Sequence, residues 1–185
     1  MTNQSILWRG VHTPGHEACR VYRSDDEWCL DGTAVFSHQN RACRLSYSVA
    51  CDLNWNTRRA VIAGWLGNDD VNVKLSVDTN HRWELNEVTE SAVNGCVDLD
   101  LNFSPSTNLL PIRRLSLQPG QTAEVIAAWL RFPSFQLQPL SQVYTRLSEF
   151  TYRYSSDGGR FVADLTVTEF GLVTSYPGIW EADPS

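Results

Sequence analysis

Alternating apolar and polar residues recur along the whole chain, and this period of two constrains its fold more than any other feature. The clearest runs are Leu45–Leu53, Val71–Val77, Val97–Phe103 and Phe161–Val167. Such alternation is typical of strands with one buried face. No comparable helical stripe occurs, apart from a turn or two between Thr107 and Arg114, where Pro111 suits an early helical position. The sequence predicts an all-β fold with at most one short helix.

Short turn sequences separate these runs. They are Asp31-Gly32, Asn68-Asp69, Asn94-Gly95, Pro119-Gly120 and Asp157-Gly158-Gly159. Connections this short favour antiparallel hairpins. A sheet of many strands accumulates twist, so we expect it to curl into a barrel, roll or sandwich. The segment Thr122–Phe132 is apolar on both faces, which predicts a strand between two layers or a strand that lines an apolar cavity.

Length and cysteine content predict one domain over residues 1–185. A chain of 185 residues can bury a core without a metal or disulfide, and no linker or repeat divides it. The five cysteines form no CxxC pair, so we expect them to be mostly reduced and buried.

Charge and hydropathy exclude several classes of partner. A net charge of −6 and a single lysine, Lys74, argue against nucleic acid as a ligand. No apolar stretch approaches the roughly 20 residues of a transmembrane helix. Met1–Gly10 lacks the pattern of a secretory signal, so we expect a cytoplasmic protein.

Two carboxylates carry the first functional hypothesis. Asp98 and Asp100 are two positions apart in a predicted strand, so both should project from one face. They could act as an acid/base pair, accept hydrogen bonds from sugar hydroxyls, or form an ordinary polar face. The nearby Asn108, Arg113 and Arg114 could clamp a polar head group with them, or form a salt-bridge network.

A second candidate surface begins at Gln142. If one unbroken strand runs from there to Tyr154, Gln142 and Tyr144 begin a face that changes from hydrogen-bonding to aromatic. Such a face could follow an amphiphile from head to tail. The seven tryptophans could likewise stack on sugars or support acyl chains, or they could be core residues.

Motifs for cofactors and catalysis are missing from the sequence. No GxSxG, GxGxxG or Walker loop occurs. His12 and His16 are separated by Pro14 and Gly15, so they cannot share a regular helical face as zinc ligands do. We therefore predict no metal and no cofactor.

The most individual stretches resemble the putative glycolipid-binding family of bacterial proteins. They are Gly95–Leu101 (GCVDLDL), Phe103–Leu115 (FSPSTNLLPIRRL), Phe132-Pro133, Pro139-Leu140, Gln142–Tyr144, Gly171–Val173 and Tyr176–Gly178. The resemblance implies a single, strongly curved antiparallel sheet, a β-roll or half-barrel, similar in shape to bacterial lipoprotein carriers. It also implies a glycolipid as ligand, by analogy of fold.

The leading hypothesis is non-catalytic binding of an amphiphile, such as a glycolipid, in the concavity of the curved sheet. The predicted ligand-binding residues are Asp98, Asp100, Asn108, Arg113, Arg114, Gln142 and Tyr144. One alternative is a hydrolase that acts on a sugar or lipid with Asp98 and Asp100 as the acid/base pair. Another is a protein-interaction module, for which homodimerisation would be the simplest sign.

Overall fold

The alternating sequences form one large sheet. The computed structural model describes residues 3–183 and contains fifteen strands in the order β8-β7-β6-β5-β4-β3-β2-β1-β15-β14-β13-β12-β11-β10-β9. All neighbours are antiparallel except β9 and β10, which are parallel. The all-β prediction is therefore confirmed, and so is the curved antiparallel sheet.

The strands are β1 (Asn3–Gly10), β2 (Gly15–Ser24), β3 (Glu27–His38), β4 (Arg41–Cys51), β5 (Thr57–Leu66), β6 (Asp69–Val77), β7 (Trp83–Leu85), β8 (Val88–Thr89), β9 (Leu99–Leu101), β10 (Thr122–Arg131), β11 (Gln136–Arg146), β12 (Thr151–Ser156), β13 (Phe161–Val167), β14 (Val173–Tyr176) and β15 (Trp180–Ala182). The helical segments are α1 (Leu109–Leu115) and the 3₁₀ turns η1 (Ser91–Val93), η2 (Ser106–Asn108) and η3 (Asp157–Gly159). Within residues 3–183, α1 is the one α-helix, and it lies where the sequence predicted a short helix.

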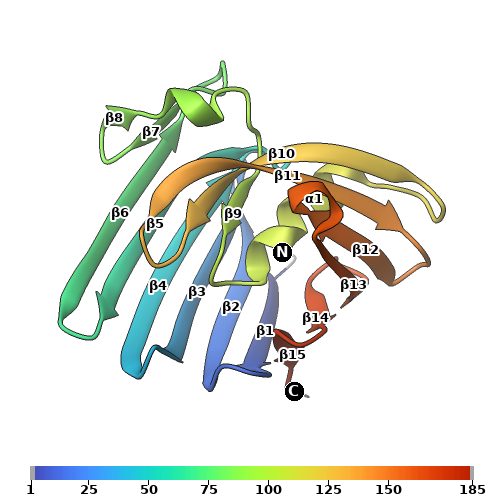
Figure 1. The fold of residues 1–185 in the computed structure, drawn as a ribbon. Helices are drawn as coiled ribbons and strands as arrows, with labels where there is room; N and C mark the ends of the chain where they lie inside the picture. The colour runs from blue at the N-terminus through green and yellow to red at the C-terminus, as the bar shows by residue number, and fades with distance from the viewer. Residues whose placement is uncertain (1–2, 184–185) are drawn as a thin grey trace.

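The sheet curls so that its two halves face each other. Figure 1 shows β1 to β6 as one wall and β10 to β13 as the other, with the yellow-green segment from β9 to α1 between them. This segment packs with both walls, because Leu99 and Leu101 belong to the same buried cluster as Leu30, while Ile112 belongs to the same buried cluster as Leu165. The concavity is therefore filled in part by the chain's own β9–α1 segment.

Thr57, on β5, joins β9 to the wall formed by β1 to β6. The Thr57 amide donates to the carbonyl of Val97 at 2.9 Å. The Leu99 amide donates to Thr57 Oγ1 at 3.1 Å. Since β9 pairs with β10 on its other side, these two bonds tie the β9 end of the sheet to β5 in the opposite wall without closing the sheet.

Three of the five predicted turns do not form hairpins. Asn94-Gly95 lies between η1 and β9, and Pro119-Gly120 lies between α1 and β10, so neither joins two antiparallel neighbours. Asp31-Gly32 lies in the middle of β3, and the connections on either side are at Asp25 and at Gln39-Asn40. Gly32 is needed here for space, because a Cβ atom would collide with the ring of Tyr47 on the neighbouring strand.

The condition of one unbroken strand from Gln142 to Tyr154 is not met. β11 ends at Arg146 and β12 begins at Thr151, so the segment is a hairpin. The hairpin nevertheless places Tyr144 directly opposite Tyr154, and their rings lie 5.2 Å apart. The aromatic face is therefore built across two strands instead of along one.

Candidate ligand-binding site

A cavity of about 550 Å³ lies between β9 and β10 on one side and β12, β13 and β15 on the other. This volume is in the usual range for small-molecule sites. Its aromatic lining comes from Trp129, Tyr154, Phe161, Tyr176 and Trp180. Its polar lining includes Asp100, Asn102, Ser104 and Asn108. Aromatic rings and hydrogen-bonding groups thus share one hollow.

Asp100 is the less exposed of the two acids that line this cavity, the other being Asp157 in η3. Asp100 lies on β9 opposite Trp129, and its side chain is partly exposed. Gln142 Nε2 donates a hydrogen bond of 2.6 Å to Asp100 Oδ2. Removal from bulk water raises the pKa of Asp100 to about 6, and the Gln142 hydrogen bond opposes that shift. At neutral pH the group is therefore a carboxylate with a second oxygen free to accept.

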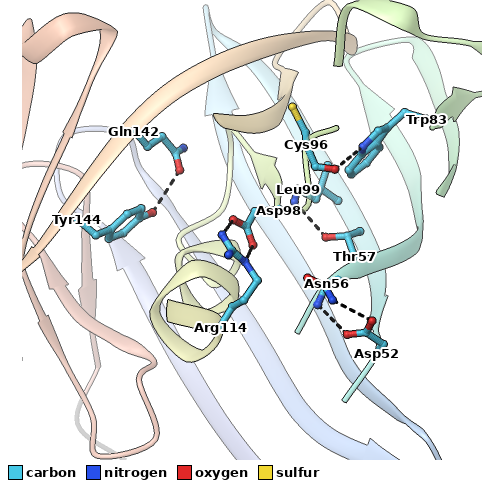
Figure 2. A network of polar contacts seen from close by, with 10 residues as sticks. All are labelled: Asp52, Asn56, Thr57, Trp83, Cys96, Asp98, Leu99, Arg114, Gln142 and Tyr144. Carbon is cyan, nitrogen blue, oxygen red and sulfur yellow. Dashed lines mark hydrogen bonds and ion pairs between the residues drawn. The ribbon is translucent and has the colours of Figure 1, made fainter. Parts of the chain in front are cut away.

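Tyr144 extends this arrangement to the β9–α1 segment. Its hydroxyl lies 3.0 Å from Asn108 Oδ1 and 3.5 Å from Gln142 Oε1, so the shorter contact to Asn108 is the better hydrogen bond. Figure 2 shows the Tyr144 ring directed toward Gln142. Burial raises the pKa of Tyr144 well above its usual value, so the hydroxyl remains a donor. Four of the predicted residues are thus brought together, since Asp100 and Asn108 line the cavity while Gln142 and Tyr144 hold them.

Asp98 and Arg114 form a separate ion pair. Arg114 reaches from α1 to both oxygens of Asp98, at 3.0 and 2.5 Å (Figure 2). The Asp98 side chain is 1% exposed, and neither residue lines the 550 Å³ cavity. Burial raises the pKa of Asp98, and the charge and hydrogen bonds of Arg114 oppose the shift.

Arg113 lies apart from both groups. Its guanidinium lies over Phe170 at 4.9 Å and over Trp55 at 5.6 Å. It lines a different, smaller cavity of about 190 Å³. The structure therefore separates Arg113 from the head-group clamp that the sequence suggested.

A buried acid beside the cavity was missed in the sequence. Glu17 on β2 is fully buried, and its Oε1 accepts hydrogen bonds from Tyr47 at 2.6 Å and from Ser104 at 2.5 Å. Burial raises the pKa of Glu17 to about 7. A signal was present, because Glu17 has the same strand phase as the buried Cys19 and Val21.

Two further findings concern the described part of the chain. Residues 3–183 contain no cluster of three or more histidine, cysteine or acidic side chains arranged to hold a metal ion. They also contain no helix with the length and apolar character needed to cross a membrane.

The fold and the cavity define a class of protein: an open, strongly curved antiparallel sheet with a mixed aromatic and polar hollow inside it. A family model described as putative glycolipid-binding matches residues 5–182. The chain belongs to this family, as its sequence motifs predicted.

A solved structure has the same fold. It is the crystal structure of a DUF1089 family protein from Pseudomonas aeruginosa, which is 29% identical in sequence. The similarity has a TM-score of 0.77 and covers 98% of this chain and 92% of the Pseudomonas chain. No match was found among the curated proteins.

Proposed function

We propose that the protein binds an amphiphilic ligand, of the glycolipid type, whose hydroxylated head group occupies the 550 Å³ cavity. The observation that carries this proposal is the position of the Asp100 carboxylate, which reaches a hollow walled by Trp129, Tyr154 and Trp180. Carboxylates accept strong hydrogen bonds from hydroxyl groups. Aromatic faces offer flat apolar plates to the C–H surfaces of a sugar ring. The family description agrees with this ligand class.

The hydrogen-bond network supports preorganisation of the site. Gln142 fixes one oxygen of Asp100, and Tyr144 fixes the side-chain oxygen of Asn108. Groups held in place before binding lose little conformational freedom when the ligand arrives. The head group would meet one carboxylate oxygen and the amide of Asn108.

The hydrogen bonds and the position of Asp98 favour binding over hydrolysis. An acid/base pair needs two carboxyl groups that reach the substrate. Both oxygens of Asp98 accept hydrogen bonds from Arg114, and Asp98 does not line the cavity. The arrangement therefore supports a binding site rather than an acid/base pair made of Asp98 and Asp100.

Titration calorimetry with octyl glucoside below its micellar concentration tests the proposal. We expect saturable binding that weakens about tenfold or more in Asp100→Asn, because a hydrogen bond to a charged acceptor is lost. The matched control is Asp164→Asn, which removes an exposed carboxylate of β13 that pairs with Arg153. Equal affinity in the wild type and Asp100→Asn would refute the site.

A further inference from the structure

A second pocket adjoins the head-group cavity. Its volume is about 270 Å³, and it shares Asn102, Ile179 and Trp180 with the larger cavity. A ligand in the larger cavity can therefore continue past Trp180 into this pocket without leaving the concave side of the sheet.

The apolar lining of the second pocket, which also has polar lining residues such as His12 and His38, includes three phenylalanine rings. Phe36 and Phe103 both pack edge-on against Phe132, with ring centroids 5.4 and 6.3 Å apart. The rings of Phe36 and Phe132 are only partly buried. Ile179, at the boundary between the two pockets, is 39% exposed. Partly exposed apolar groups in a hollow are the surface that an alkyl chain covers most favourably.

The direction of the ligand's alkyl chain follows from which end of the sheet is blocked. At one end, Trp28 stacks on Trp55 at 4.6 Å, and Phe170 packs against both rings. Arg113 covers the Phe170 ring. This aromatic stack joins the start of β3 to the β13–β14 loop and fills that end.

The second pocket, called the Phe36 pocket from here on, lies at the opposite end of the sheet. Gly10 and His38 are the last residues of β1 and β3, just before the turns β1–β2 and β3–β4, while Thr13 lies in the turn β1–β2 and Gly178 lies in the turn β14–β15. All of these turns lie at the same ends of their paired strands, since Gly10 pairs with Trp180 and Gly15 pairs with Phe36. The polar and apolar parts of the concave surface are thus arranged in sequence, from Asp100 to the Phe36 pocket.

We propose that the Phe36 pocket holds the alkyl or acyl chain of the ligand, and that this chain leaves between the turns β1–β2, β3–β4 and β14–β15. This inference rests on the proposed function and names the ligand class more closely: a hydroxylated head with an apolar chain attached directly beside it. The boundary residue Trp180 would contact the junction of head and chain.

The test compares methyl, hexyl and octyl glucoside by calorimetry, with all ligands below their micellar concentrations. We expect the affinity of wild type to rise about three- to fourfold for each added methylene that enters the pocket. In Phe36→Ala this gain should fall by at least half, while the affinity for methyl glucoside stays unchanged. Phe36→Leu provides a second variant that keeps an apolar side chain in the strand. The control is Phe150→Ala, which removes a more exposed phenylalanine that lines another cavity.

The outcomes separate the two proposals. Equal affinity for methyl and octyl glucoside in wild type overturns the chain pocket and leaves the head-group site standing. A chain-length gain that persists in both Phe36 variants also overturns it. Octyl glucoside binding that depends on Phe36 but not on Asp100 supports the chain pocket and overturns the head-group site. No binding of any of the three ligands overturns both.

Discussion

Ser104 and Glu17 lie 87 residues apart in the sequence, and Ser104 Oγ donates a hydrogen bond of 2.5 Å to Glu17 Oε1. Ser104 belongs to the segment between β9 and α1, and Glu17 belongs to β2 in the wall formed by β1 to β6. This contact fastens the inserted segment, and with it one side of the ligand cavity, onto the sheet.

Glu17 should make stability depend on pH. Its pKa rises from 4.5 to about 7 on folding, so the fold favours the neutral carboxyl. This stabilisation is fully present below about pH 4.5 and is lost as pH rises through about 7. Glu17→Gln should remove that dependence, and by about pH 8 the wild type should have lost about 3 kcal/mol relative to acidic conditions. Urea unfolding at several pH values measures the effect. Glu124→Gln, on the exposed face of β10, should leave the wild-type pH dependence in place.

Arg114 and Arg113 should differ in their effect on stability. Arg114→Ala leaves the buried Asp98 without its partner, which typically costs 3–5 kcal/mol. Arg113→Ala removes an exposed side chain that covers Phe170 and should cost about 1 kcal/mol or less. Chemical denaturation of the two single variants gives the comparison. Similar losses in both would contradict a specific role for the Asp98–Arg114 pair.

Thr57 should be sensitive to loss of its hydroxyl. Thr57→Val keeps the shape of the side chain but removes the acceptor for the buried Leu99 amide (Figure 2). An unsatisfied buried amide costs about 1–3 kcal/mol. Hydrogen exchange should show faster opening at Leu99, which native-state exchange can resolve residue by residue. Thr33→Val, which removes the hydroxyl that contacts Ser46, is the matched control and should have a smaller effect.

Ligand affinity should fall in acid because Asp100 becomes protonated. The pKa of Asp100 in the free protein is about 6, and a neutral carboxyl is a weaker acceptor for hydroxyl groups. Octyl glucoside should bind about tenfold more weakly at about pH 5 than at about pH 7.5 if only the ionised form binds it well. In Asp100→Asn the affinity should be independent of pH over this range. A wild-type affinity that does not change with pH would show that the carboxylate does not contact the ligand.

Local patterns in the sequence predicted the strands but not which distant residues meet. The period of two placed the buried side of β4, β6 and β13, where residues such as Leu45, Val73 and Leu165 are inside. The same pattern extends to Glu17, which shares the buried phase of β2, but its burial was not predicted from the sequence. Its partner Ser104 could not be identified, because the contact depends on how the β9–α1 segment enters the concavity.

The candidate site shows the same limit. Asp100 and Gln142 are 42 residues apart, and their hydrogen bond arises from the packing of β9 and β11 around β10. Arg113 and Arg114 are adjacent, but successive residues on a helix point about 100° apart, so they meet different neighbours. The orientation of α1 against the sheet decides which one pairs with Asp98. A single domain over residues 1–185, a cytoplasmic location and a homodimer stay predictions from the sequence.

The most direct test of the central claim is native mass spectrometry of the protein purified gently from its own host, followed by extraction and identification of any bound molecule. The account predicts one amphiphile with a hydroxylated head group and an apolar chain per binding site, with clearly lower occupancy in Asp100→Asn. A mass equal to that of the bare chain, together with no binding of added glycolipids, would contradict it.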